Sequence, residues 1–129
     1  HIGYHDVWCG PDTEPGQAAG CPPVFDCPLP SDIPERLGAL RGTLASGDIF
    51  VDRPDQVEHI LAMYPDAVAV DMESAAIAQV CYMKGVPFVA IRVISDTPGK
   101  ADNFAQYVNF WNDAPERTFA TLTELLRLL

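Results

Sequence analysis

Short apolar runs alternate with amphipathic patterns from Gly42 onward, and this alternation limits what the chain can fold into. Residues 42–46 and 67–70 are brief runs, the second apolar enough to be buried on both faces of a sheet. Residues 86–94 form the strongest strand pattern. Strands that alternate with helices predict an α/β domain with a largely parallel sheet, whose ligands bind at the carboxyl ends of its strands.

Helix patterns separate and follow these runs. The first opens at residues 53–55, where proline and an acidic residue suit a first helical turn. The second covers about residues 73–84 and ends at Gly85, and the last covers roughly residues 104–128, where Pro115 should cap a segment or kink it.

The amino-terminal segment has a different composition. Seven of the 12 prolines and four of the 9 glycines fall within residues 1–34. Because these residue types interrupt helices and central strands, we expect residues 1–34 to be mostly loop and residues 35–129 to carry the alternating elements.

The charge of the chain argues against polyanionic partners. Its 129 residues hold 8 Lys and Arg against 18 Asp and Glu, a net charge of −10, with no basic cluster. Nucleic-acid phosphates and anionic lipid surfaces would be repelled. The sequence as given also lacks an apolar run long enough to span a membrane, so we expect a soluble protein that binds neither.

Four cysteines, Cys9, Cys21, Cys27 and Cys81, have no spacing typical of a zinc or redox motif. Reduced thiols in the cytoplasm are the favoured interpretation, while one disulfide or a metal site stays open.

Acidic residues follow two of the predicted strands. Asp71 and Glu73 come after the strand at 67–70, and Ser95 and Asp96 end the next. A carboxylate at such a crevice is partly desolvated, which raises its pKa and favours its protonated form. The alternative for each acid is a helix N-terminal cap, although two such strand ends together favour a site.

The order of these motifs resembles a known family. V-D-M-E-S-A-A-I-A-Q-V-C at 70–81, V-P-F-V at 86–89 and R-V-I-S-D at 92–96 resemble the carboxy-terminal half of the bacterial 5′-methylthioadenosine/S-adenosylhomocysteine nucleosidases, within the nucleoside phosphorylase superfamily. S-G-D-I-F-V at 46–51 and parts of the loop at 4–22 extend the similarity over nearly the whole chain. The resemblance implies that residues 1–129 are the carboxy-terminal part of one nucleosidase domain, a partial three-layer α/β/α fold with a mixed, largely parallel sheet.

The resemblance also implies catalytic roles. Breaking a purine N-glycosidic bond places positive charge on the ribose and negative charge on the leaving base. Asp96, kept protonated and oriented by Ser95, matches the acid that protonates purine N7. Glu73 matches the glutamate that accepts hydrogen bonds from the ribose hydroxyls, with Met72 packed under the sugar. Core packing is the alternative for Met72.

Further residues match the binding pocket of the family. Phe50 would stack on adenine while the backbone of Val51 reads the edge of the base, with core packing as the alternative for Phe50. Tyr107 or Phe104 would close the 5′-alkylthio pocket. Trp8 would act in trans, because the family's equivalent of loop 4–20 crosses a homodimer interface, although a surface anchor fits Trp8 equally well.

The implied activity is hydrolysis of methylthioadenosine and S-adenosylhomocysteine, with no cofactor and no metal, in the cytoplasm. Other candidates stay weaker, since His5 and Asp6 are adjacent in a loop and His59 lies on a helix face. The family's water-activating glutamate has no counterpart here, so we predict weak hydrolysis or none by this chain alone. A purine nucleoside phosphorylase, another purine nucleoside hydrolase, and a non-catalytic nucleoside-binding or interaction module remain alternatives.

Overall fold

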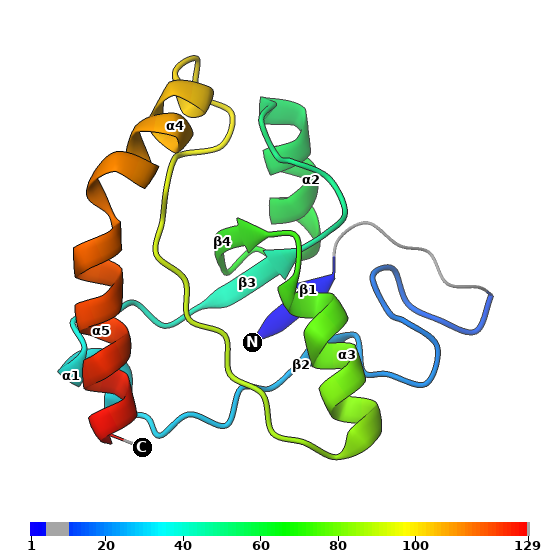
Figure 1. Ribbon diagram of the computed structural model, residues 1–129. Helices are drawn as coiled ribbons and strands as arrows, with labels where there is room; N and C mark the ends of the chain where they lie inside the picture. Colours follow the sequence, from blue (N-terminus) through cyan, green and yellow to red (C-terminus); the bar gives the residue numbers. More distant parts are fainter. Residues whose placement is uncertain (5–10, 129) are drawn as a thin grey trace.

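The structure is a computed structural model that describes residues 1–4 and 11–128 (Figure 1). In chain order its elements are β1 (Ile2–Tyr4), β2 (Val24–Phe25), α1 (Ile33–Arg36), β3 (Thr43–Ser46), α2 (Pro54–Met63), β4 (Ala67–Asp71), α3 (Ser74–Lys84), α4 (Asn103–Asp113) and α5 (Pro115–Leu128). No described helix is both long and apolar enough to cross a membrane.

The four strands form one sheet in the order β2-β1-β3-β4. β1 pairs with β3 and β3 pairs with β4 in parallel, whereas β2 runs antiparallel to β1. The predicted α/β class with a mixed, largely parallel sheet is confirmed.

Strand β3 connects two apolar clusters because successive side chains point to opposite faces of a sheet. Leu44 belongs to a cluster with Ala75 and Ala78 of α3, and its neighbour Ala45 belongs to one with Ile60 of α2. Helices therefore pack on both faces of the sheet, and all four residues of β3 are buried.

Local signals place the helix ends well. α2 begins at Pro54, and the Gln56 side chain accepts the backbone N–H of Arg53 at 3.0 Å. α3 ends at Gly85, whose φ of 65° is the left-handed conformation that glycine adopts without strain. Pro115 starts a new helix rather than kinking one, so the single predicted helix over 104–128 is two, α4 and α5.

Where it is described, the amino-terminal segment contains β1, β2 and the first residues of α1, joined by loops. Strand β4 departs from expectation, because Val68 is 54% exposed rather than buried on both faces.

The largest error concerns residues 86–94, which form no strand and belong to the long connection from α3 to α4 (Figure 1). A strand needs a neighbour that bonds its N–H and C=O groups. The sequence pattern indicates only that these residues are able to form a strand. In the part of the chain that is described, no strand pairs with them.

Candidate active site

A cavity of about 660 Å³ runs along β4 and past its carboxyl end. The loop after β3, the turn between β4 and α3, the connection at 92–98 and helix α4 all contribute to its wall. This position agrees with the expectation that ligands of parallel sheets bind beyond the ends of the strands.

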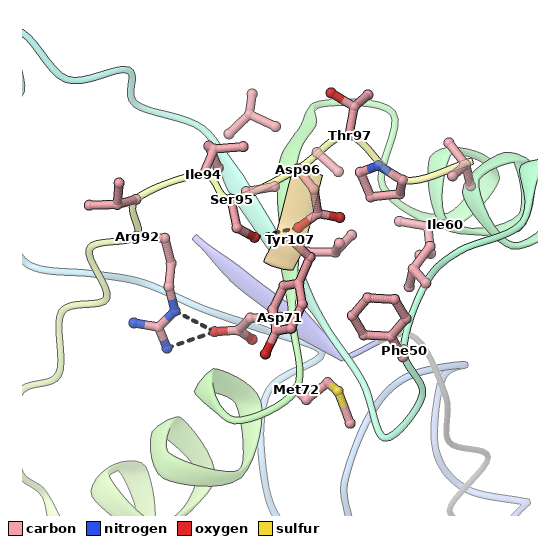
Figure 2. Close-up of a pocket in the computed structure, with 18 of the residues that line it drawn as sticks. Phe50, Ile60, Asp71, Met72, Arg92, Ile94, Ser95, Asp96, Thr97 and Tyr107 are labelled. Atoms are coloured by element: carbon pink, nitrogen blue, oxygen red, sulfur yellow. Dashed lines mark hydrogen bonds and ion pairs between the residues drawn. The ribbon is translucent and has the colours of Figure 1, made fainter. Parts of the chain in front are cut away.

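Residues far apart in the sequence meet at this cavity (Figure 2). Those that the sequence nominated and that line it are Phe50, Val51, Met72, Glu73, Ser95, Asp96 and Tyr107.

One nominated residue lies elsewhere. Phe104 is 72% exposed and lines a separate cavity of about 450 Å³, which Phe50 and Tyr107 share. Trp8 falls outside the described residues, as do His5 and Asp6.

Aromatic rings form one side of the main cavity. The rings of Phe50 and Tyr107 meet edge to face, with centroids 5.8 Å apart and an interplanar angle of 77°. Phe50 is 43% exposed, so core packing does not describe it. Trp111, four residues after Tyr107, extends the aromatic series at 6.2 Å. Trp111 was not nominated from the sequence, although its i, i+4 spacing from Tyr107 indicates a shared face of the helix.

A hydrogen bond from helix α4 holds the backbone of Val51. Val51 is buried, and its carbonyl accepts a hydrogen bond from Nδ2 of Asn103 at 3.4 Å. Asn103 is itself buried, and its Oδ1 has no hydrogen-bond partner among the described residues. Asn103 was not nominated; its residue type gave no indication that it would reach across to the loop after β3.

The two nominated carboxylates differ in their surroundings. Ser95 Oγ donates a hydrogen bond to the carboxylate of Asp96 (Figure 2), and both residues are partly buried. Glu73 is exposed just before α3, where its Oε2 accepts the backbone N–H of Met72 at 3.3 Å. Met72 is 43% exposed, which argues against core packing for it too.

Asp71 is held in a network that joins four segments. Arg92 donates from Nε to its Oδ2 at 2.7 Å (Figure 2), and the Ser74 backbone N–H donates to its Oδ1 at 3.2 Å. Ser74 Oγ bridges Arg92 and Asp71, and Ser46 at the end of β3 accepts the N–H of Ala75 at 3.0 Å. Asp71 thus accepts the N–H of the first residue of α3, although the N-cap position is Glu73 and makes no side-chain cap hydrogen bond. Arg92 lines the cavity and was not nominated from the sequence.

The raised pKa expected for a strand-end carboxylate is wrong for Asp71. Burial raises the pKa of its carboxyl, but hydrogen bonds from Ser74, Ser46 and Arg92, together with the charge of Arg92, outweigh burial and lower it. The sequence pattern predicted an acidic residue at the end of a strand. It gave no sign that Arg92, 21 residues later, would form an ion pair with that residue.

Three of the cysteines, Cys21, Cys27 and Cys81, are unpaired, and Cys9 lies outside the described residues. Among residues 1–4 and 11–128, no three His, Cys, Asp or Glu side chains gather closely enough to hold a metal ion.

Known proteins are similar to this chain in both sequence and fold. The model of the Phosphorylase superfamily matches residues 9–127, and the chain belongs to that superfamily. Within it, the resemblance to the 5′-methylthioadenosine/S-adenosylhomocysteine nucleosidases is confirmed. The nucleosidase of Bacillus subtilis is 41% identical over 108 residues, which cover 77% of this chain and 47% of the relative.

Solved structures agree. One is S-adenosylhomocysteine nucleosidase from Streptococcus pyogenes, in complex with 5-methylthiotubericidin. The match covers 99% of this chain and 57% of the nucleosidase chain, with a TM-score of 0.88 and 32% sequence identity. Another is the nucleosidase from Neisseria meningitidis, in complex with methylthio-immucillin-A. This match covers 99% of this chain and 59% of the nucleosidase chain, with a TM-score of 0.85 and 28% sequence identity. The chain spans about half the length of the curated relatives it matches.

Proposed function

We propose that this chain carries the purine- and ribose-binding part of a nucleosidase that hydrolyses 5′-methylthioadenosine and S-adenosylhomocysteine to release adenine. The observation that carries the proposal is the meeting of Asp96, Glu73 and Phe50 at one cavity from three separate segments. Membership of the superfamily and the methylthio ligands of the similar structures support the choice of substrate.

Asp96 acts as the acid in this proposal. Its proton passes to N7 of the purine as the bond between N9 and C1′ breaks, so that adenine leaves neutral. The hydroxyl of Ser95 orients the carboxyl. Water adds to C1′ and releases a proton to solvent, from which Asp96 is reprotonated, and the thio-ribose is the second product.

Glu73 holds the sugar. Its exposed carboxylate accepts hydrogen bonds from the 2′- and 3′-hydroxyls and stabilises the positive charge that develops on the ribose. Met72, beside it on the same turn, packs under the ring.

The aromatic side of the cavity holds the rest of the substrate. Phe50 stacks on adenine, and the backbone of Val51, supported by Asn103, reads the edge of the base. Tyr107 closes the pocket around the 5′-alkylthio group, and Phe104 contributes from the neighbouring cavity. We further propose that the protein acts as a cytoplasmic homodimer in which Trp8 reaches the partner's 5′ pocket.

The test is release of adenine from 5′-methylthioadenosine, measured by chromatography. No water-activating base is assignable among the described residues, so we expect turnover by this chain alone to fall at least about 100-fold below that of the complete Bacillus subtilis enzyme. Equal turnover by the two would contradict the proposed division of labour.

Phosphorolysis is the second candidate, because the matching family is the Phosphorylase superfamily. A phosphorylase uses phosphate in place of water and yields a sugar phosphate. Adenine release that is unchanged when phosphate is omitted would exclude it.

A further inference from the structure

A second cavity lies beside the candidate active site and carries both signs of charge. Its volume is about 450 Å³, and it shares Phe50 and Tyr107 with the main cavity. Beyond these rings its wall includes Asp52, Lys100 and Asn103. Because the same two aromatic side chains line both cavities, a ligand held in the main cavity can extend into the second.

Two loops bring the charged residues to this cavity. Asp52 lies on the loop after β3, and Lys100 lies on the connection that leads to α4. The loops meet at Gly99, whose φ is 75°, and a Cβ placed there would lie 3.4 Å from the backbone N and Cα of Pro54. The N–H of Asn103 then donates to the carbonyl of Lys100 at 3.1 Å. Backbone contacts thus hold the two charges at one cavity.

Neither charge has an ion-pair partner in the part of the chain that is described. No ion pair joins Lys100 or Asp52 to another residue there, or to each other. Arg53 feels the charge of Asp52, yet its guanidinium donates to both carboxylate oxygens of Asp55, at 3.0 and 3.2 Å. A ligand with one cationic and one anionic group of its own would satisfy both side chains.

The buried amide of Asn103 adds a hydrogen-bond acceptor to the same wall. Its Nδ2 donates to the carbonyl of Val51, and because a carbonyl only accepts, this bond fixes which end of the amide is the oxygen. Oδ1 is buried and has no partner among the described residues. Buried acceptors are rarely without a donor, and a bound ion or water often supplies it. An ammonium group in this cavity would do so directly or through one water.

An α-amino acid on the 5′ sulfur of adenosine carries the matching groups. In S-adenosylhomocysteine two methylene groups join the sulfur to a carbon that bears one ammonium and one carboxylate, whereas 5′-methylthioadenosine has only a methyl group there. A 5′-phosphate would satisfy Lys100 but would be repelled by Asp52 and by the net charge of −10. A zwitterion has no net charge and avoids this repulsion.

We propose that the second cavity binds the α-amino-acid end of S-adenosylhomocysteine, and we call it the amino-acid pocket after its charged residues Asp52 and Lys100. Lys100 donates to the carboxylate, while Asp52 and Asn103 accept from the ammonium. The pocket gives the chain a preference for S-adenosylhomocysteine over 5′-methylthioadenosine. The inference rests on the proposed function, because the adenosine part must occupy the main cavity.

The test titrates the full 129-residue chain with nucleosides in a calorimeter. The probes are S-adenosylhomocysteine, 5′-methylthioadenosine and 5′-butylthioadenosine, whose tail has a similar length to homocysteine but no charge. S-adenosylhomocysteine should bind at least about tenfold more tightly than either of the others, because only it makes the charge-assisted hydrogen bonds. This preference should shrink between about 0.05 and 0.5 M salt, since both charged side chains are exposed.

Variants assign the preference to the two charges. Lys100→Gln and Asp52→Asn should each lower the ratio of S-adenosylhomocysteine affinity to 5′-methylthioadenosine affinity at least about threefold. A merely structural role would change the two affinities together and leave the ratio unchanged. Lys84→Gln is the matched control, because Lys84 is the only other lysine and lines neither cavity. Asp12→Asn, at an exposed position, is the control for Asp52→Asn.

Three results would overturn the proposal. The first is equal affinity for S-adenosylhomocysteine and 5′-methylthioadenosine, and the second is a ratio in both pocket variants equal to that of their controls. The third is tighter binding of 5′-butylthioadenosine than of S-adenosylhomocysteine, which would assign the cavity to an apolar group.

The same data separate this inference from the proposed function. Binding of 5′-methylthioadenosine without a preference for S-adenosylhomocysteine would contradict the amino-acid pocket alone. The preference, found in a complex with the part of the Bacillus subtilis nucleosidase outside the match that cleaves no nucleoside, would support the pocket and contradict the proposed hydrolysis. Binding of none of the nucleosides would overturn both.

Discussion

Asp71 shows how one side chain holds the candidate site together. Its carboxylate, with the side chain 9% exposed, ties β4 to the start of α3 and to Arg92 on the connection that leads to Asp96. The position of the proposed acid thus depends on a residue that does no chemistry in the proposed reaction.

Replacement of Asp71 should destabilise the fold in a pH-dependent way. Asp71→Asn removes the charge opposite Arg92 and should cost about 1–3 kcal/mol at pH 7. The folded pKa of Asp71 lies below its ordinary value of 3.8, so its stabilisation is present above that value and is lost as the pH falls through it toward the folded pKa. Urea unfolding of parent and variant should therefore differ most near neutral pH and converge below about pH 4. Asp12→Asn, at an exposed position, is the control, and an Asp71→Asn deficit that stayed constant with pH would contradict this account.

Asn103 should matter for binding as well as stability. Asn103→Ala removes the donor that holds the Val51 carbonyl and should cost about 1–2 kcal/mol of folding free energy. If Val51 reads the base, binding of adenine nucleosides should weaken as well. Calorimetric titration of the chain with 5′-methylthioadenosine checks this, with Gln79→Ala on α3, away from the cavity, as the control. Unchanged affinity in Asn103→Ala would show that the loop after β3 does not need this bond.

At the level of elements, the sequence predicted the ends of helices better than it predicted which segments pair as strands. The ends of α2 and α3 followed from Pro54 and Gly85, because caps depend on residues within one turn. Residues 86–94 failed as a strand because pairing depends on a neighbour that no local pattern reveals. Seven nominated residues line one cavity: four follow β3 or β4, two lie on the connection before α4, and one lies on α4. Arg92 and Asn103 act through contacts with residues distant in sequence, which no local pattern indicates.

The end of α3 offers a test at this level. Gly85→Ala places a Cβ at a φ of 65° in open space, so any effect comes from backbone strain rather than from a clash. We expect a loss of about 1 kcal/mol and a lower melting temperature in circular dichroism. Lys84→Ala, one residue earlier, should change stability by less than about 0.5 kcal/mol. A variant at Gly85 as stable as the parent would mean that the helix ends by other means.

At the level of the whole molecule, helices α4 and α5 expose several large apolar side chains. Phe119 and Leu126 are 68% and 66% exposed, and Trp111 is 63% exposed. Surface of this kind favours association. We therefore expect the chain alone to self-associate at micromolar concentration in light scattering.

Phe119→Lys combined with Leu126→Lys should reduce that association, whereas Val80→Lys, at a 54% exposed position on α3, should not. A clean monomer of the parent at micromolar concentration would contradict the prediction and would indicate a self-sufficient fold.

The central claim is that Asp96 is the acid of a nucleosidase site completed by the part of the relatives that this chain does not span. The most direct measurement compares adenine release from 5′-methylthioadenosine by complexes of the parent chain and of Asp96→Asn, each co-expressed with the part of the Bacillus subtilis nucleosidase outside the match. We predict that the substitution lowers turnover at least about 100-fold while nucleoside binding is retained. Equal turnover by the two complexes would contradict the claim.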